Sequence, residues 1–443
     1  MLRTSLHTRL QQGALDFLSG IITFPGYEEK DRQLIERAFS CQDDISKEES
    51  NIKALLVHEA THLMDLLTTN WGAEYVARKN ALHNNIGCDE FEKSLAVFMI
   101  NSAEIESHYR LNVSYSEEDL NVASFIRHGL LYDNQFGPII VVQYVKDDLV
   151  IQETPLSMLS LLEAHATSEE FLSMIRDVKG TKDYLADLQF IKKDFYSLLG
   201  DKEFSEYSLL LYLTDLHLKD FLGFEEVLRF VSALSRFSLD ASSITCGILG
   251  TNIRDTFENK LVGYDLSMDL CRGMSRQVIY FKTVLLLYGW LHNAAGKDRD
   301  RLLRSLSISP FSAIYEFFEM NGIEIYKNTD DIEFDCLVSH IPEESMLPDK
   351  AHLAQVSGKN REILKSNTLA EKFEDVYLPQ VLLGDDTEAF PMNCIAEEHM
   401  WFVKDNFEIY AKLDSVYRKN VHRKFHPDLG SGQDFFNPER LLF

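Results

Sequence analysis

Apolar residues recur at three- and four-residue steps along most of the chain up to about residue 320. This spacing matches the period of an α-helix with one buried face. In the first half it predicts helices at residues 31–39, 51–67, 73–81, 91–109, 156–178 and 184–199. Further helices follow, most clearly at 224–237 and 277–292, and no internal repeat is found. The pattern therefore predicts a mainly α protein.

One segment departs from the helical pattern. Residues 138–152 read PIIVVQYVKDDLVIQ, in which two β-branched runs flank Lys146, Asp147 and Asp148. Such runs around a short polar turn predict a β-hairpin. Thr154 and Pro155 follow directly, and we expect them to be the N-cap and first-turn residues of the next helix.

The same patterns suggest four regions. We expect an N-terminal helical segment at 1–50, a central core at 51–178, a helical domain at 179–321 and a mixed region at 322–443. The last region is richer in proline, glycine, aspartate and short strand-like pieces than the rest.

Charge narrows the range of partners. The 443 residues include 44 Lys plus Arg and 70 Asp plus Glu, which gives a formal net charge of −26. Proteins that bind nucleic acid need clustered cations to neutralise phosphates. We therefore expect no nucleic-acid partner, while the sequence leaves the oligomeric state undetermined.

Cysteine spacing and hydropathy bear on the compartment. The six cysteines form no CxxC pair, which favours a reducing environment. The first thirty residues carry Asp16 in their most apolar stretch and lack the pattern of a signal peptide. The apolar stretch at 278–291 is interrupted by Lys282 and is shorter than the roughly 18–20 residues that span a bilayer. We expect a cytoplasmic protein that does not bind membranes.

The chemistry is concentrated in the predicted helix at 51–67. His58, Glu59 and His62 form an HExxH motif, with the two histidines one helical turn apart. Imidazoles in this arrangement can bind one zinc ion, and the glutamate can take a proton from a water on that ion. We expect a Zn²⁺ site with Glu59 as general base. The alternative is a packed helix whose histidines are hydrogen-bonded, for example to Asp65.

A zinc enzyme of this kind needs a third protein ligand. Asp65 and Thr68 exclude the HExxHxxGxxH form, and Leu82 stands where a thermolysin-like spacing expects glutamate. Glu163 is favoured because it lies in SMLSLLEAHAT, where apolar and small neighbours would bury an unpaired carboxylate. The alternatives left open are Glu74, Glu90, Glu92, Glu104, Glu106 and His165.

The motif and the Glu163 segment together resemble a known family. The segment VHEATHLMDLLTTNWG is similar to the active-site helix of a diverse group of prokaryotic HExxH zinc metallopeptidases of the gluzincin type. In that group a later helix of the form L-L-E-G-x-A, after a hairpin and a proline, resembles the bearer of the third ligand. Here the match is LLEAHA, residues 161–166. Asp65 replaces a frequent Gln, and Ala164 replaces a frequent Gly.

The resemblance covers these two segments and implies both a fold and a function. It implies a mainly α chain with a zincin-like catalytic core at 51–178, a small β-hairpin or sheet and a large helical scaffold. It also implies a selective metallopeptidase that hydrolyses a protein or peptide substrate, with zinc held by His58, His62 and Glu163. The alternatives are hydrolysis of another amide or ester, or a helical interaction protein with a structural or vestigial metal site.

Supporting roles are assigned more broadly. Asp65 is a candidate to accept a hydrogen bond from a zinc-bound histidine, with a helix-surface acid as the alternative. The hairpin is a candidate edge for an extended peptide, although known zincins place that strand before the motif helix. Candidates for stabilising an oxyanion are Tyr75, His83, Tyr109, His128, Tyr144 and His165. More remote histidines, which we expect to be structural or surface residues, are His340, His399, His422 and His426.

Overall fold

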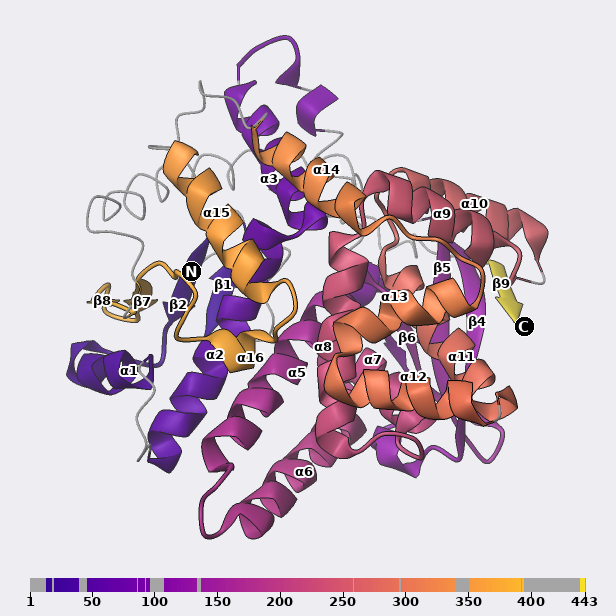
Figure 1. Ribbon diagram of the computed structural model, residues 1–443, viewed down its shortest axis with the longest axis horizontal. Helices are drawn as coiled ribbons and strands as arrows, with labels where there is room; N and C mark the ends of the chain where they lie inside the picture. Colours follow the sequence, from indigo (N-terminus) through magenta and orange to yellow (C-terminus); the bar gives the residue numbers. More distant parts are fainter. Residues whose placement is uncertain are drawn as a thin grey trace.

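The computed structural model describes most of the chain, and all statements below concern this part. It covers residues 13–17, 20–39, 46–85, 87–91, 93–95, 107–133, 137–257, 259–294, 296–339, 350–391, 393 and 439–442. The mainly helical class predicted from the sequence is confirmed (Figure 1).

Helices form most of the described structure. Their bounds in chain order are α1 (Arg32–Ala38), α2 (Lys47–Thr68), α3 (Asn70–Asn84), α5 (Met158–Val178), α6 (Tyr184–Gly200), α7 (Ser205–Leu218), α8 (Phe224–Asp240), α9 (Ser243–Arg254), α10 (Lys260–Cys271), α11 (Gln277–Asn293), α12 (Lys297–Ile308), α13 (Pro310–Met320), α14 (Lys327–Ser339), α15 (Lys350–Leu364) and α16 (Leu369–Lys372). The predicted helices at 31–39, 51–67, 73–81, 156–178, 184–199, 224–237 and 277–292 are confirmed as α1, α2, α3, α5, α6, α8 and α11. The helix predicted at 91–109 lies largely outside the described residues.

The strands form two small sheets. The first has the order β1 (Ala14–Asp16), β2 (Ile21–Phe24), β7 (Val381–Leu383) and β8 (Glu388–Ala389). The second has the order β3 (Val113–Ser114), β6 (Leu149–Pro155), β5 (Gly137–Lys146), β4 (Phe125–Asp133) and β9 (Glu439–Leu442). In the first sheet β2 pairs in parallel with β7, so two segments more than 350 residues apart in the sequence share one sheet.

Helix α5 occupies the centre of the helical body. It packs against α2, α7 and α8, and Figure 1 shows α2, α5 and α8 side by side with α5 in the middle. Ala164 and Ala166 are fully buried, and such small side chains allow neighbouring helices to approach closely. Because α2 and α5 are neighbours, the HExxH helix and the Glu163 helix face each other.

The predicted hairpin is confirmed as β5 and β6. Asp147 and Asp148 form its turn with φ angles of 48° and 65°, in the left-handed region that two-residue hairpin turns use. The prediction that Thr154 and Pro155 open the next helix is wrong, because both residues are paired in β6. The N-cap of α5 is Ser157, whose hydroxyl accepts a hydrogen bond from the Ser160 amide.

Some strands were missed by the sequence analysis. The segment 1–50, expected to be helical, contains β1 and β2 in addition to α1. Strand β4 was also missed, and it lies between β5 and β9 in the second sheet. None of the helices in the described ranges combines the length and the apolar character required to cross a membrane.

Candidate metal centre

Helix α2 presents the HExxH motif within the protein interior. The helix begins at an N-cap, Ser46, whose hydroxyl accepts from the Glu49 amide while the Glu49 carboxylate accepts from the Ser46 amide. His58, Glu59 and His62 are all buried, with exposed fractions of 5%, 3% and 4%. The two imidazole centroids are 5.0 Å apart, as their one-turn spacing on the helix requires.

Helix α5 brings Glu163 to the same point. The Glu163 Oε2 atom lies 3.4 Å from His58 Nε2 and 3.4 Å from His62 Nε2. One ligand atom from each of the three residues fits within 4.8 Å, so this buried group could hold a metal ion. The predicted combination of His58, His62 and Glu163 is therefore brought together by the fold.

The hydrogen bonding of this group suits a cation. Glu163 Oε2 and His62 Nδ1 are buried atoms without a hydrogen-bond partner in the described part of the chain. Buried polar atoms of this kind normally have a partner. Two ligands bound tetrahedrally to zinc at about 2.0–2.1 Å are roughly 3.4 Å apart, which matches both measured separations. The donor set thus fits a bound metal.

Charge around Glu163 points the same way. Burial by itself would raise the pKa of Glu163, but the two imidazoles outweigh burial and lower the pKa to about 2. Burial would lower the pKa of His58, but Glu163 and Glu170 raise that pKa well above its usual range. The pocket thus favours a carboxylate at Glu163 with positive charge beside it.

Glu59 lies next to the two histidines but has different surroundings. Burial raises its pKa, against the opposing effects of His58, His62 and a hydrogen bond from the backbone of Leu15. Leu15 belongs to β1, which approaches α2 closely. A Cβ atom on Gly13 would lie 3.1 Å from Glu59 Cγ and 2.6 Å from the Phe24 ring. Only glycine allows this approach of the chain to the motif.

The strand beside the motif is therefore β1 and not the predicted hairpin. Among the described strands, β1 pairs on one side only, with β2. In the hairpin, β5 is paired on both sides and β6 is flanked by β5 and β3. The expectation that the hairpin offers a free edge is confined to part of β6, because β4 covers β5 and β3 covers β6 at Gln152 and Glu153.

Two carboxylates near the site have partners that the sequence did not indicate. Asp65 is fully buried, and its Oδ1 atom accepts a hydrogen bond from His165 Nδ1 at 2.8 Å, so its described partner is neither His58 nor His62. Glu170 contacts the other ring nitrogen of His58, with its Oε2 atom 3.0 Å from His58 Nδ1. The signal for Glu170 was its position two helical turns after Glu163, on the same face of α5.

The alternative third ligands are engaged elsewhere or lie outside the description. Glu74 forms ion pairs with Arg276 and Arg78, at 3.2 and 3.3 Å. Glu90 is exposed and pairs with Lys93 at 2.9 Å. His165 bonds to Asp65, as noted above. Glu92, Glu104 and Glu106 are outside the described residues.

The candidate oxyanion donors are dispersed. Tyr75 stacks on Trp71 with centroids 5.7 Å apart, and both rings contact Phe17, which in turn packs on His62. Tyr207, which the sequence analysis did not select, has its ring 5.9 Å from that of His58. The remaining candidates lie elsewhere: Tyr109 is exposed, His128 packs on Phe281 and Tyr144 packs on Tyr212. Outside the described residues or side chains are His83, His340, His399, His422 and His426.

Comparison with known proteins leaves the site as the main source of functional information. No family model, no curated protein and no solved structure matches this chain.

Proposed function

We propose that this protein is a zinc-dependent metallopeptidase. The observation that supports the proposal best is the convergence of His58, His62 and Glu163 on one point, with Glu59 beside them. The resemblance of the two motif segments to gluzincin-type enzymes supports the same class, with a zincin-like core formed around α2 and α5. Three protein ligands are the set found in catalytic zinc sites, which keep one position open.

Each residue of the group has a distinct task in this proposal. Glu170 holds the Nδ1–H of His58, which leaves the Nε2 lone pair of that ring directed at the centre. His62 Nε2 and Glu163 Oε2 supply the other two ligand atoms. When bound, zinc supplies a Lewis acid that polarises the scissile carbonyl and makes water acidic near neutral pH.

Glu59 is the proposed general base. It is buried, and burial raises its pKa, which makes the carboxylate a stronger base. The hydrogen bond from the Leu15 backbone fixes the carboxylate next to β1. Glu59 would accept the proton of the attacking water and pass it to the leaving amine.

Strand β1 is the proposed guide for the substrate. It has a strand partner on one side only among the described residues, and it contacts the motif helix. An extended peptide can add to such an edge through main-chain hydrogen bonds, which depend little on sequence. We infer that the scissile bond would be delivered to Glu59 along this strand.

The deciding experiment combines metal analysis with one conservative variant. Zinc per chain is measured after dialysis, and hydrolysis of a mixed-protein digest is followed for the wild-type protein, Glu59→Gln and Glu362→Gln. We expect about one zinc per chain in all three, and a loss of at least about 100-fold in hydrolysis by Glu59→Gln alone. Glu362 is the control because it is an exposed glutamate on α15, away from the site.

Two results would contradict the proposal. Hydrolysis by Glu59→Gln at the wild-type rate would remove the role assigned to Glu59. Absence of zinc, with none taken up on titration, would favour the alternative of a helical interaction protein.

A further inference from the structure

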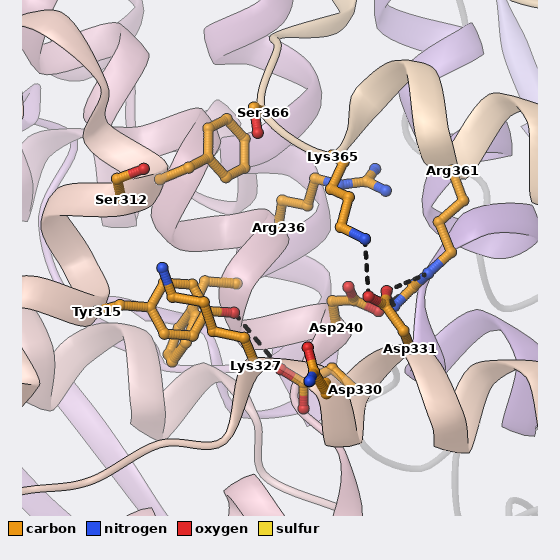
Figure 2. A pocket seen from close by; sticks show the side chains of 13 residues that line it. Arg236, Asp240, Ser312, Tyr315, Lys327, Asp330, Asp331, Arg361, Lys365 and Ser366 are labelled. Atoms are coloured by element: carbon orange, nitrogen blue, oxygen red, sulfur yellow. Dashed lines mark hydrogen bonds and ion pairs between the residues drawn. The ribbon is translucent and has the colours of Figure 1, made fainter.

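A second polar site lies between four helices, away from the HExxH motif. A cavity of about 240 Å³ is lined by residues of α8, α13 and α14 and by the end of α15 with the residues that follow it (Figure 2). Four cations line it, in a chain with a net charge of −26. They are Arg236, Lys327, Arg361 and Lys365.

The three carboxylates of this cavity are already satisfied. Asp240 Oδ1 accepts from Arg361 at 2.6 Å and from the Asn70 amide at 3.1 Å. Asp331 accepts from Arg361 and Lys365, at 3.0 and 2.8 Å. Asp330 is buried and accepts from the Ser242 amide and the Thr245 hydroxyl, at 2.8 and 2.9 Å. No acidic group of the cavity therefore needs a cationic ligand.

Two of the four cations, the buried Arg236 and the exposed Lys327, are not bonded to a carboxylate in this way. Arg236 is only 6% exposed, and it donates to the Thr68 hydroxyl at 3.1 Å and to the Thr68 carbonyl at 3.4 Å. Within the described part of the chain, no carboxylate forms an ion pair with Arg236 or Lys327. A guanidinium cannot lose its proton, and buried charges are normally paired. Burial lowers the pKa of Arg236, and Asp240, Asp65 and Glu169 oppose that shift without forming an ion pair with it. The lining of the cavity holds four cations against three carboxylates.

The lining of the cavity also includes aromatic rings. Lys327 Nζ lies 4.4 Å from the centroid of the Tyr315 ring, and Phe237 and Phe311 also line the space. Figure 2 shows Lys327 against Tyr315, with Arg236, Lys365 and Arg361 across the pocket. An arginine and a lysine that form no ion pair among the described residues suit a phosphate group, because the arginine provides directed donors and the lysine a mobile charge.

We propose that this cavity binds a phosphate group, either as free phosphate or on a small phosphomonoester. The phosphate is held between Arg236 and Lys327, and the satisfied carboxylates fix Arg361 and Lys365 at the wall. A ring carried by the ester packs on Tyr315. The binding does not depend on the proposed peptidase activity.

Calorimetric titration of the full chain tests the proposal. Inorganic phosphate and adenosine monophosphate are titrated separately, at low ionic strength, into the wild-type protein, Lys327→Gln and Lys359→Gln. Lys359 is the matched control because it is also exposed and lies over a tyrosine ring, 5.1 Å from the Tyr377 centroid, but does not line the cavity. Far-ultraviolet circular dichroism verifies that each variant is folded.

We expect saturable phosphate binding that Lys327→Gln weakens about tenfold and Lys359→Gln leaves within about twofold. Tighter binding of adenosine monophosphate than of phosphate would support the phosphomonoester, and equal binding would support free phosphate. Absence of saturable binding of both anions overturns the proposal, as does equal affinity in wild-type protein and Lys327→Gln. Failure of the peptidase proposal would show in zinc content and leave these titrations unchanged.

Discussion

Two buried polar clusters lie along the same helix, α2, and they are chemically opposite. In the middle of the helix, His58 and His62 meet Glu163, so that lone pairs converge and a carboxylate oxygen lacks a donor. At its last residue, Thr68, the guanidinium groups of Arg236 and Arg361 converge, so that donors gather.

The difference shows how the excess charge of a buried cluster indicates its ligand. A cluster with unsatisfied acceptors is completed by a cation, and one with uncompensated donors by an anion. The clusters also differ in origin. The first cluster consists of two histidines one turn apart on α2 and one glutamate on α5. The second belongs to a cavity lined by residues of α8, α13, α14 and α15. The experiments below test this contrast, beginning with the largest expected effect.

Removing the third ligand has the largest expected effect. Glu163→Ala should weaken zinc binding by more than about 100-fold, because changes outside the ligands themselves already cost about 10–100-fold. Competition with a chromophoric chelator measures the affinity. Glu90→Ala is the matched control, since Glu90 is an exposed glutamate paired with Lys93. Unchanged zinc affinity in Glu163→Ala would mean that another residue is the third ligand, and the cluster around Glu163 would no longer be a cation site.

A smaller effect is expected at the carboxylate behind His58. Glu170→Gln keeps the size of the side chain but weakens its hold on His58 Nδ1–H, so zinc affinity should fall about tenfold. The same chelator assay applies, with Glu225→Gln as control because Glu225 is a surface glutamate that pairs with Lys179 at 3.3 Å. An affinity equal to wild type would make the Glu170–His58 contact a surface ion pair without influence on the metal.

The smallest effect concerns a buried cation that can lose its proton. Burial lowers the pKa of Lys282 from the ordinary value of 10.5 to about 8, and its ammonium lies over the Phe257 ring. Between about pH 8 and pH 9 this lysine keeps its proton in the unfolded chain and loses it in the folded one, so the free energy of unfolding should rise with pH. Above pH 9 the buried Cys246 thiol acts in the opposite direction, because burial raises its pKa from 9.0 to about 11. Urea unfolding between about pH 8 and pH 9 measures the rise.

Substitution of the same lysine identifies the source of the pH dependence. Lys282→Met should abolish the rise, while Lys192→Met, which removes a lysine over the Phe224 ring, should retain it. A rise that persists in Lys282→Met would assign the pH dependence to other groups. Lys282 would then differ from Arg236 in a simple way, because a buried lysine amine can lose its proton and a guanidinium cannot.

The sequence predicted the elements whose pattern is local. The helical period of residues 51–67 and the two β-branched runs around Asp147 each lie within one segment, and both predictions were confirmed. Strands β2 and β9 were missed because each short sequence pairs with a strand far along the chain, β7 and β4 respectively. Strand β1 was missed because it is only three residues long, and it pairs locally with β2. Pro155 was assigned to the first turn of the next helix, where proline is common, but it is the last residue of strand β6. Proline is tolerated at both kinds of position, so its presence alone does not distinguish them.

In the candidate site, too, the local patterns were predicted and the long-range contacts were not. HExxH is readable because its spacing matches one helical turn, and Glu163 was detectable as an acid among apolar neighbours. That prediction agrees with the geometry, while its chemistry remains to be tested. The Leu15 contact to Glu59 and the pairing of Arg361 with Asp240 were not predictable, because each joins segments that no local pattern connects.

The parallel pairing of β2 with β7 bears on how the protein is made. The ribosome delivers α2 and α5 long before it delivers Val381–Leu383, the strand that β2 needs on its open side. During synthesis the three ligands therefore exist before the sheet that carries β1 is complete, and non-local pairing of this kind forms slowly. A nascent or truncated chain that stops before Val381 would hold the three ligand residues and the β1–β2 pair, but it would lack β7 beside β2.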